Sequence, residues 1–147
     1  MAIIKGGDKA ADVLKTIGDK SRGLTLSVGF FEGATYPDGT SVPEVAFTNE
    51  FGVPQHHQPP RPFFRNMIAQ ESSSWGPKIA AAMKGTGNDG KKSLELVGDN
   101  VKGALIQSIT DLTSPPLAPA TIARKGFDKP LVDTGQMRNS ITFKVDG

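Results

Sequence analysis

The sequence predicts an α+β fold in which a small antiparallel sheet carries helices packed on one face. Two stretches alternate apolar and polar residues as half-buried strands do, residues 24–31 near the start and 140–145 near the end. Between them lies the strongest helical spacing in the chain, formed by Leu94, Val97, Val101, Leu105, Ile109 and Leu112. The 147 residues are enough to bury a core, and we expect one domain over residues 1–147.

Two further elements are expected around the first strand. A helix should begin after Asp8 and stop near Gly18, with its apolar residues on one face: Ala10, Val13, Leu14 and Ile17. After the strand, Pro37-Asp38-Gly39 predicts a turn, because proline fixes its own φ and glycine accepts a positive one. A second short strand around this turn is compatible with the pattern.

The middle of the chain should be helical, with two interruptions. A helix is expected over 42–51, with a proline in its first turn and Gly52 as its cap. Residues 53–62 contain four prolines and should form a loop that leads into a second helix, which continues or kinks at Gly76-Pro77. Residues 85–92 predict a flexible connector before the 94–112 helix. One more short helix is expected over 117–123.

The composition excludes several classes of protein. There are 17 Lys and Arg against 15 Asp and Glu, and the resulting charge of +2 is too small to indicate nucleic-acid binding by itself. The chain has no cysteine, so disulfides and cysteine-based zinc sites are excluded. Residues 1–20 lack a long apolar run and carry early acidic residues, so we expect neither a signal peptide nor a membrane span.

The tripeptide Asp133-Thr134-Gly135 raises one enzymatic alternative, because aspartic proteases carry their catalytic carboxylate in this sequence. A homodimeric aspartyl protease using Asp133 would bring two such acids together to activate a water. However, the tripeptide lies near the end of the chain, and a long helix precedes it, whereas retroviral-type proteases are all-β and place it near the start. We therefore expect Asp133 and Gly135 to form a helix cap or a tight turn before the last strand.

Other candidate sites favour structural interpretations. His56 and His57 are adjacent and therefore point apart, and the chain has no third histidine, so we expect an exposed loop and no metal. A modest basic cluster surrounds the expected connector and could face nucleic acid, although solvated lysines are the simpler interpretation: Lys78, Lys84, Lys91 and Lys92. No phosphate-binding loop or nucleophile elbow is present. We expect no enzyme activity and no cofactor.

Two stretches carry a family resemblance. Residues 42–68 read VPEVAFTNEFGVPQHHQPPRPFFRNMI, and residues 121–145 read TIARKGFDKPLVDTGQMRNSITFKV. The pattern Asn-Glu-Phe-Gly, a variable loop and Arg-Pro-Phe-Phe-Arg, followed later by Pro-Leu-x-Asp-Thr-Gly and Ser-Ile, resembles neck and tail-completion proteins of long-tailed bacteriophages. This is the minor tail protein Z-like group of virion-morphogenesis proteins. The resemblance covers both ends of the chain and leaves out residues 69–116.

The resemblance implies a structural role in the virion, in particles assembled in the host cytoplasm. The expected place is the head–tail junction or the head-proximal tail end, with tail tube, terminator and head-connector proteins as partners. A tail-terminator or head-closure ring is the alternative within this reading. We expect a homo-oligomeric ring, passing contact with DNA in the channel and no membrane contact. The connector at 85–92 and the N-terminal residues would become ordered only in the assembly.

Four residues are the expected partner-contact set, because arginine beside aromatic side chains is typical of interfaces. They are Glu50, Arg61, Phe63 and Arg65. Arg61 is the first contact candidate, with Glu50 as its charge partner. For the two phenylalanines a core position is the favoured interpretation, and the alternative for the two arginines is that they are merely exposed. Gly52, Asp133 and Gly135 are expected to shape turns and caps.

Overall fold

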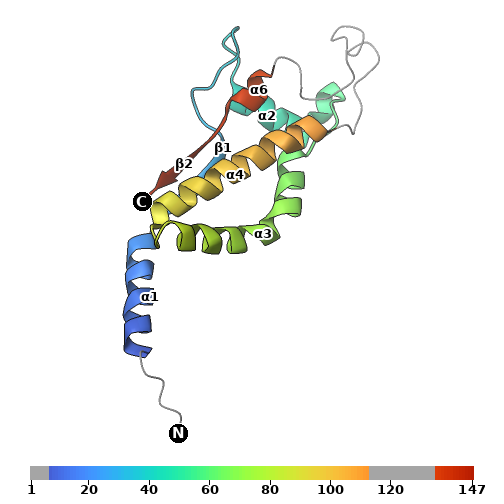
Figure 1. The fold of residues 1–147 in the computed structure, drawn as a ribbon. Helices are drawn as coiled ribbons and strands as arrows, with labels where there is room; N and C mark the ends of the chain where they lie inside the picture. The colour runs from blue at the N-terminus through green and yellow to red at the C-terminus, as the bar shows by residue number, and fades with distance from the viewer. Residues whose placement is uncertain (1–6, 113–134) are drawn as a thin grey trace.

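The computed structural model describes residues 7–112 and 135–147. Two strands and five helices, together with a short 3-10 turn, make up this part of the chain (Figure 1). In order they are α1 (Gly7–Ser21), β1 (Thr25–Phe30), α2 (Val42–Phe51), η1 (Pro54–His56), α3 (Phe63–Gly85), α4 (Gly90–Asp111), α6 (Gln136–Asn139) and β2 (Ile141–Asp146). None of these helices is both long enough and apolar enough to span a membrane.

The two predicted strands pair with each other and pack on α4. β1 and β2 are antiparallel, and their register runs from Thr25 opposite Asp146 to Phe30 opposite Ile141. α4 approaches the sheet closely at Gly98, where an added Cβ would lie 2.6 Å from the ring of Phe143. The fold class is therefore α+β, as predicted, with helices packed against the strands.

The core is built along the predicted stripe of α4. Val97, Val101, Leu105 and Ile109 are buried there, as the three-and-four spacing requires. Around them lie further buried apolar side chains from α2, α3, α6 and β2: Val42, Ala46, Phe63, Met67, Met137 and Ile141.

α3 is one helix that bends. It contains Pro77, which has no N–H to donate and whose ring crowds the carbonyl four residues earlier. Figure 1 shows α3 changing direction along its length before it leads into α4. The helix therefore kinks rather than stops, which is one of the two outcomes that Gly76-Pro77 predicted.

The prediction of a flexible connector at residues 85–92 is wrong. The chain turns within a few residues, and α4 already begins at Gly90. Asp89 caps α4 by accepting the backbone N–H of Lys92 at 3.0 Å, and the hydroxyls of Thr86 and Ser93 lie 2.7 Å apart. Ser93 is fully buried. Glycines and polar residues are typical of flexible linkers, but they are equally typical of a tight turn followed by a helix cap, which is what they form here.

α1 continues past Gly18, where the sequence predicted a stop, and ends at Ser21. A glycine inside a helix costs only about 1 kcal/mol, so it does not end one by itself. The reversal comes instead at Gly23, whose φ of 77° is in the left-handed region. Figure 1 shows α1 projecting away from the other elements.

The loop after β1 holds the predicted turn. Tyr36 and Thr40 are joined by a backbone hydrogen bond of 2.8 Å, and Asp38 accepts the N–H of Thr40 through its side chain at 2.9 Å. Thr35 and Ser41 form a single β-bridge, which is all that this segment shows of the second strand. The short helix expected at 117–123 lies outside the described residues.

Candidate partner-binding cleft

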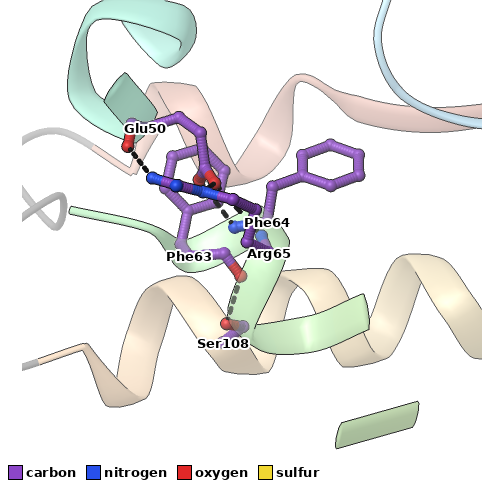
Figure 2. A network of polar contacts seen from close by, with 5 residues as sticks. All are labelled: Glu50, Phe63, Phe64, Arg65 and Ser108. Carbon is purple, nitrogen blue, oxygen red and sulfur yellow. Dashed lines mark hydrogen bonds and ion pairs between the residues drawn. The ribbon is translucent and has the colours of Figure 1, made fainter. Parts of the chain in front are cut away.

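Glu50 joins the end of α2 to the start of α3. Its side chain accepts the backbone N–H groups of Phe64 at 2.9 Å and Arg65 at 3.1 Å, and it forms an ion pair with the Arg65 Nε at 2.8 Å (Figure 2). Arg65 also donates to the backbone oxygen of Glu50 at 2.9 Å. Glu50 is only 5% exposed, so each of these bonds replaces water that its carboxylate has lost. We call this arrangement the Glu50 clasp.

The clasp replaces a missing helix cap. Pro62 precedes α3 and makes no side-chain cap, so the first N–H groups of the helix need another acceptor. The Glu50 carboxylate accepts two of them from 14 and 15 residues upstream. A negative charge at a helix N-terminus is also favourable toward the helix dipole. From α4, Ser108 donates to the Phe63 oxygen at 2.6 Å and fixes the same turn of α3 from the other side (Figure 2).

Gly52 allows the chain to fold back from α2 to α3. It has φ 75° and ψ 173°, a region that only glycine adopts readily. An added Cβ would also lie 2.7 Å from the backbone oxygen of Gln58 and from the nitrogen of Pro60. Asn49 closes the loop, because its backbone oxygen accepts the N–H of Arg61 at 2.6 Å. The Asn-Glu-Phe-Gly sequence is thus a device for joining two helices.

A cleft of about 540 Å³ opens beside the clasp. It lies between β1, α2 and the first two turns of α3, and most of its lining is apolar: Val28, Phe30, Phe31, Pro43, Ala46, Phe47, Phe51, Phe63, Phe64 and Ile68. Phe47 is 64% exposed, and Phe51 and Ile68 are exposed as well. Exposed aromatic side chains gathered around a concave surface are typical of a protein-binding site.

Arg65 forms part of the wall of this cleft. Its guanidinium carbon lies 5.1 Å from the centre of the Phe51 ring, and the rings of Phe51 and Phe47 are 4.7 Å apart. The Arg65 side chain is 55% exposed, although its ion pair with Glu50 holds it in place. A cation on an aromatic face is worth roughly 0.5–1 kcal/mol at such an exposed position.

The structure places the four predicted contact residues in different environments and corrects the Glu50–Arg61 charge pair. Glu50 pairs with Arg65 and not with Arg61, and Phe63 belongs to the core at 1% exposure. Arg61 is also buried, and its Nε has no hydrogen-bond partner within residues 7–112 and 135–147. Burial lowers the pKa of Arg61 from its ordinary value. Of the four residues, only Arg65 presents its side chain at the surface; proximity in sequence to aromatic residues did not distinguish it from Arg61.

The remaining candidates are placed as follows. Gly135 has φ 73° and immediately precedes α6, so it makes a turn before the last strand. Asp133 lies outside the described residues. His56 and His57 are exposed in the loop, with His57 in the left-handed region at φ 54°. Within residues 7–112 and 135–147, no three metal-ligating side chains come together.

The lysines near the α3–α4 turn are partly engaged with acidic or polar neighbours. Lys78 contacts Glu71 at 3.1 Å and Asn100 at 2.8 Å, and Lys92 lies 3.9 Å from Asp89. Lys84 and Lys91 are exposed. Two of the four lysines thus have acidic neighbours and two do not, which leaves a small positive charge at this turn.

Sequence reasoning missed Phe47, Phe51, Phe64 and Ile68 as surface residues of one site. One signal was available: the apolar residues of 42–51 surround the helix instead of following one stripe, so α2 cannot bury all of them against one core. The shape of the cleft, by contrast, depends on the long-range clasp and could not be read from local spacing.

No family model, curated protein or solved structure matches this chain. The site is therefore interpreted from its own chemistry. It offers an apolar concave surface with a fixed arginine at its wall, which is suited to binding an apolar side-chain cluster of another protein.

Proposed function

We propose that this protein is a structural virion-morphogenesis protein that acts at the head–tail junction or the head-proximal tail end of a long-tailed bacteriophage. It completes the tail or joins it to the head by binding other proteins, and it performs no chemistry. A terminator or head-closure ring is the nearest variant of this role.

One observation carries the proposal. The stretch that resembles the phage family, from Asn49 to Arg65, folds into a single unit that presents an aromatic cleft at the surface. Most of its polar residues are used internally, to cap α3 and to hold the loop, so the cleft wall is apolar apart from Arg65 and the clasp carboxylate. Such a surface supports assembly better than catalysis, which needs titratable groups aimed at a reacting atom.

The experiment uses the phage that encodes this chain. Deleting the gene should leave heads and tails that do not join, and adding the purified protein to such a lysate should restore infectious particles. Phe47→Asp should fail to restore them, because a charge in the cleft opposes burial of an apolar partner. Leu96→Asp, an exposed leucine on α4 outside the cleft, is the matched control and should restore them. Joined, infectious particles in the absence of the gene would contradict the proposal.

The aspartyl protease remains the enzymatic alternative, and it depends on Asp133. Asp133→Asn would abolish cleavage of a peptide library if the carboxylate were catalytic. Under the structural role, wild-type protein and the variant should give the same background, and the variant should still restore infectivity.

A further inference from the structure

α1 exposes an apolar face that the described chain does not cover. Val13 is 52% exposed and Leu14 is 68% exposed, although both lie on the apolar face that the helical spacing of residues 10–17 predicts. The helix meets the remainder of the structure at its C-terminal end, where Ser21 lies against Gly90 at the start of α4. A 15-residue helix is about 22 Å long, so most of its length stands clear of the other elements.

The cleft beside the Glu50 clasp is the complementary feature. It is concave, and its rim exposes apolar side chains, whereas α1 is convex and exposes apolar side chains along one stripe. An amphipathic helix that lays its apolar face into such a groove is a recurring mode of recognition between proteins. Covering both surfaces would remove from water two apolar areas that single molecules leave exposed.

Charge supports the same pairing. Glu32 and Glu44 each directly follow a residue that lines the cleft, and both are exposed. Neither carboxylate has an ion-pair partner among the residues that the structure describes, and the same is true of Lys15, which follows Leu14 on α1. The two cations at the cleft, Arg65 in its wall and Lys144 beside Phe31, are each paired with a carboxylate. The unpaired charges next to the cleft are therefore negative, and a lysine on an approaching helix would meet them favourably.

Among the described residues, the α1 helix of the same copy cannot be the occupant of the cleft. Figure 1 shows α1 and α2 at opposite ends of the described structure, with α4 and the sheet between them. One copy therefore cannot place its own α1 in its own cleft without moving that helix as a whole.

We infer that α1 of one copy binds in the cleft of a second copy of this chain, with Leu14 against Phe47 and Phe51. Each copy then offers one helix and one cleft, so the contact is heterologous and repeats from copy to copy until a ring closes. The inference deepens the proposed ring-forming role, but it concerns self-association alone and can be tested without a phage.

Two variants that disable opposite sides of the contact test it. Leu14→Asp damages the helix and leaves the cleft intact, and Phe47→Asp does the reverse. Both positions are more than half exposed, so circular dichroism and thermal unfolding should show that both variants fold as the wild type does. By light scattering at matched concentrations, the wild type should form oligomers, and each variant alone should remain at the monomer mass of 15.5 kDa.

An equimolar mixture of the two variants gives the decisive result. It contains one intact helix and one intact cleft, so it should form a dimer of twice the monomer mass and nothing larger. Leu96→Asp is the control, because Leu96 is an exposed leucine that belongs neither to the α1 face nor to the cleft. This variant should assemble as the wild type does.

Three results would overturn the inference: a monomeric wild type, oligomers that persist in Leu14→Asp, or a mixture that stays monomeric. The last result would show that an intact α1 on one copy does not bind an intact cleft on another. If the pairing holds but the protein does not restore infectious particles, then the phage role fails and the self-association stands.

Discussion

The junction between α2 and α3 and the projecting helix α1 both expose apolar side chains, but only the junction is tied to the remainder of the chain. At the junction, a buried carboxylate makes three bonds to the start of α3, and a serine from α4 fixes the same turn. Along α1, Val13 and Leu14 lie in the open. The comparison indicates that the junction is a preformed surface, whereas we propose that α1 obtains its packing from a second copy.

The difference also separates two kinds of mutational effect. Changes at the junction should lower the free energy of unfolding, because the bonds there lie within the chain. Changes on α1 should leave unfolding almost unaltered and act on assembly. The predictions below run from the largest expected loss of stability to the smallest.

Glu50→Ala should have the largest effect. It leaves two N–H groups of α3 without their acceptor and removes the ion-pair partner of Arg65, so we expect a loss of about 3 kcal/mol. Urea unfolding followed by circular dichroism measures this loss. Glu95→Ala, an exposed residue of α4, is the control and should change stability by no more than about 0.5 kcal/mol. Equal effects at the two positions would show that the clasp contributes nothing.

Gly52→Ala should follow, with a loss of about 2 kcal/mol, because a Cβ at this backbone conformation is strained and meets backbone atoms at 2.7 Å. Gly103→Ala is the matched glycine control. It lies in α4 with no atom within 4 Å of the added Cβ, and should gain about 0.5–1 kcal/mol. Thermal unfolding of both variants shows whether each change lowers or raises the stability. A Gly52→Ala protein as stable as the wild type would contradict the backbone geometry described for Gly52.

Ser108→Ala should cost about 1 kcal/mol, since it removes a single hydrogen bond to the Phe63 oxygen. Ser72→Ala, an exposed serine of α3, should be neutral or slightly stabilising. The same unfolding assay measures both. If the two serines behave alike, α4 does not fix the first turn of α3.

Local patterns predicted much of the fold but little of the site. Spacing alone placed α4, β1 and β2, because apolar periodicity records which face each element buries. Gly52 was predicted as a cap from the same kind of signal. The Glu50–Arg65 pair was not predicted, because it joins residues that are 15 positions apart across a proline-rich loop, and nothing in that loop indicates where it returns.

The failure at Arg61 has a related cause. Arg61 and Arg65 flank the same two phenylalanines in sequence. Arg61 precedes α3 and is buried, whereas Arg65 lies in the first turn of α3 and reaches the surface. The prediction for residues 85–92 failed for a different reason. Their glycines and polar side chains are compatible both with a flexible linker and with a capped turn. Tertiary contacts decide between such alternatives, and local sequence patterns do not show which tertiary contacts form.

The most direct test of the central claim, that α1 of one copy occupies the cleft of the next, is a cysteine cross-link between separately prepared variants. The chain has no cysteine of its own, so each variant carries one, and any disulfide must join two copies at the engineered positions. After mild oxidation, the pairing predicts that a covalent dimer carrying one of each variant dominates over like-with-like dimers. A mixture that cross-links no better than Leu14→Cys with Leu96→Cys would contradict it.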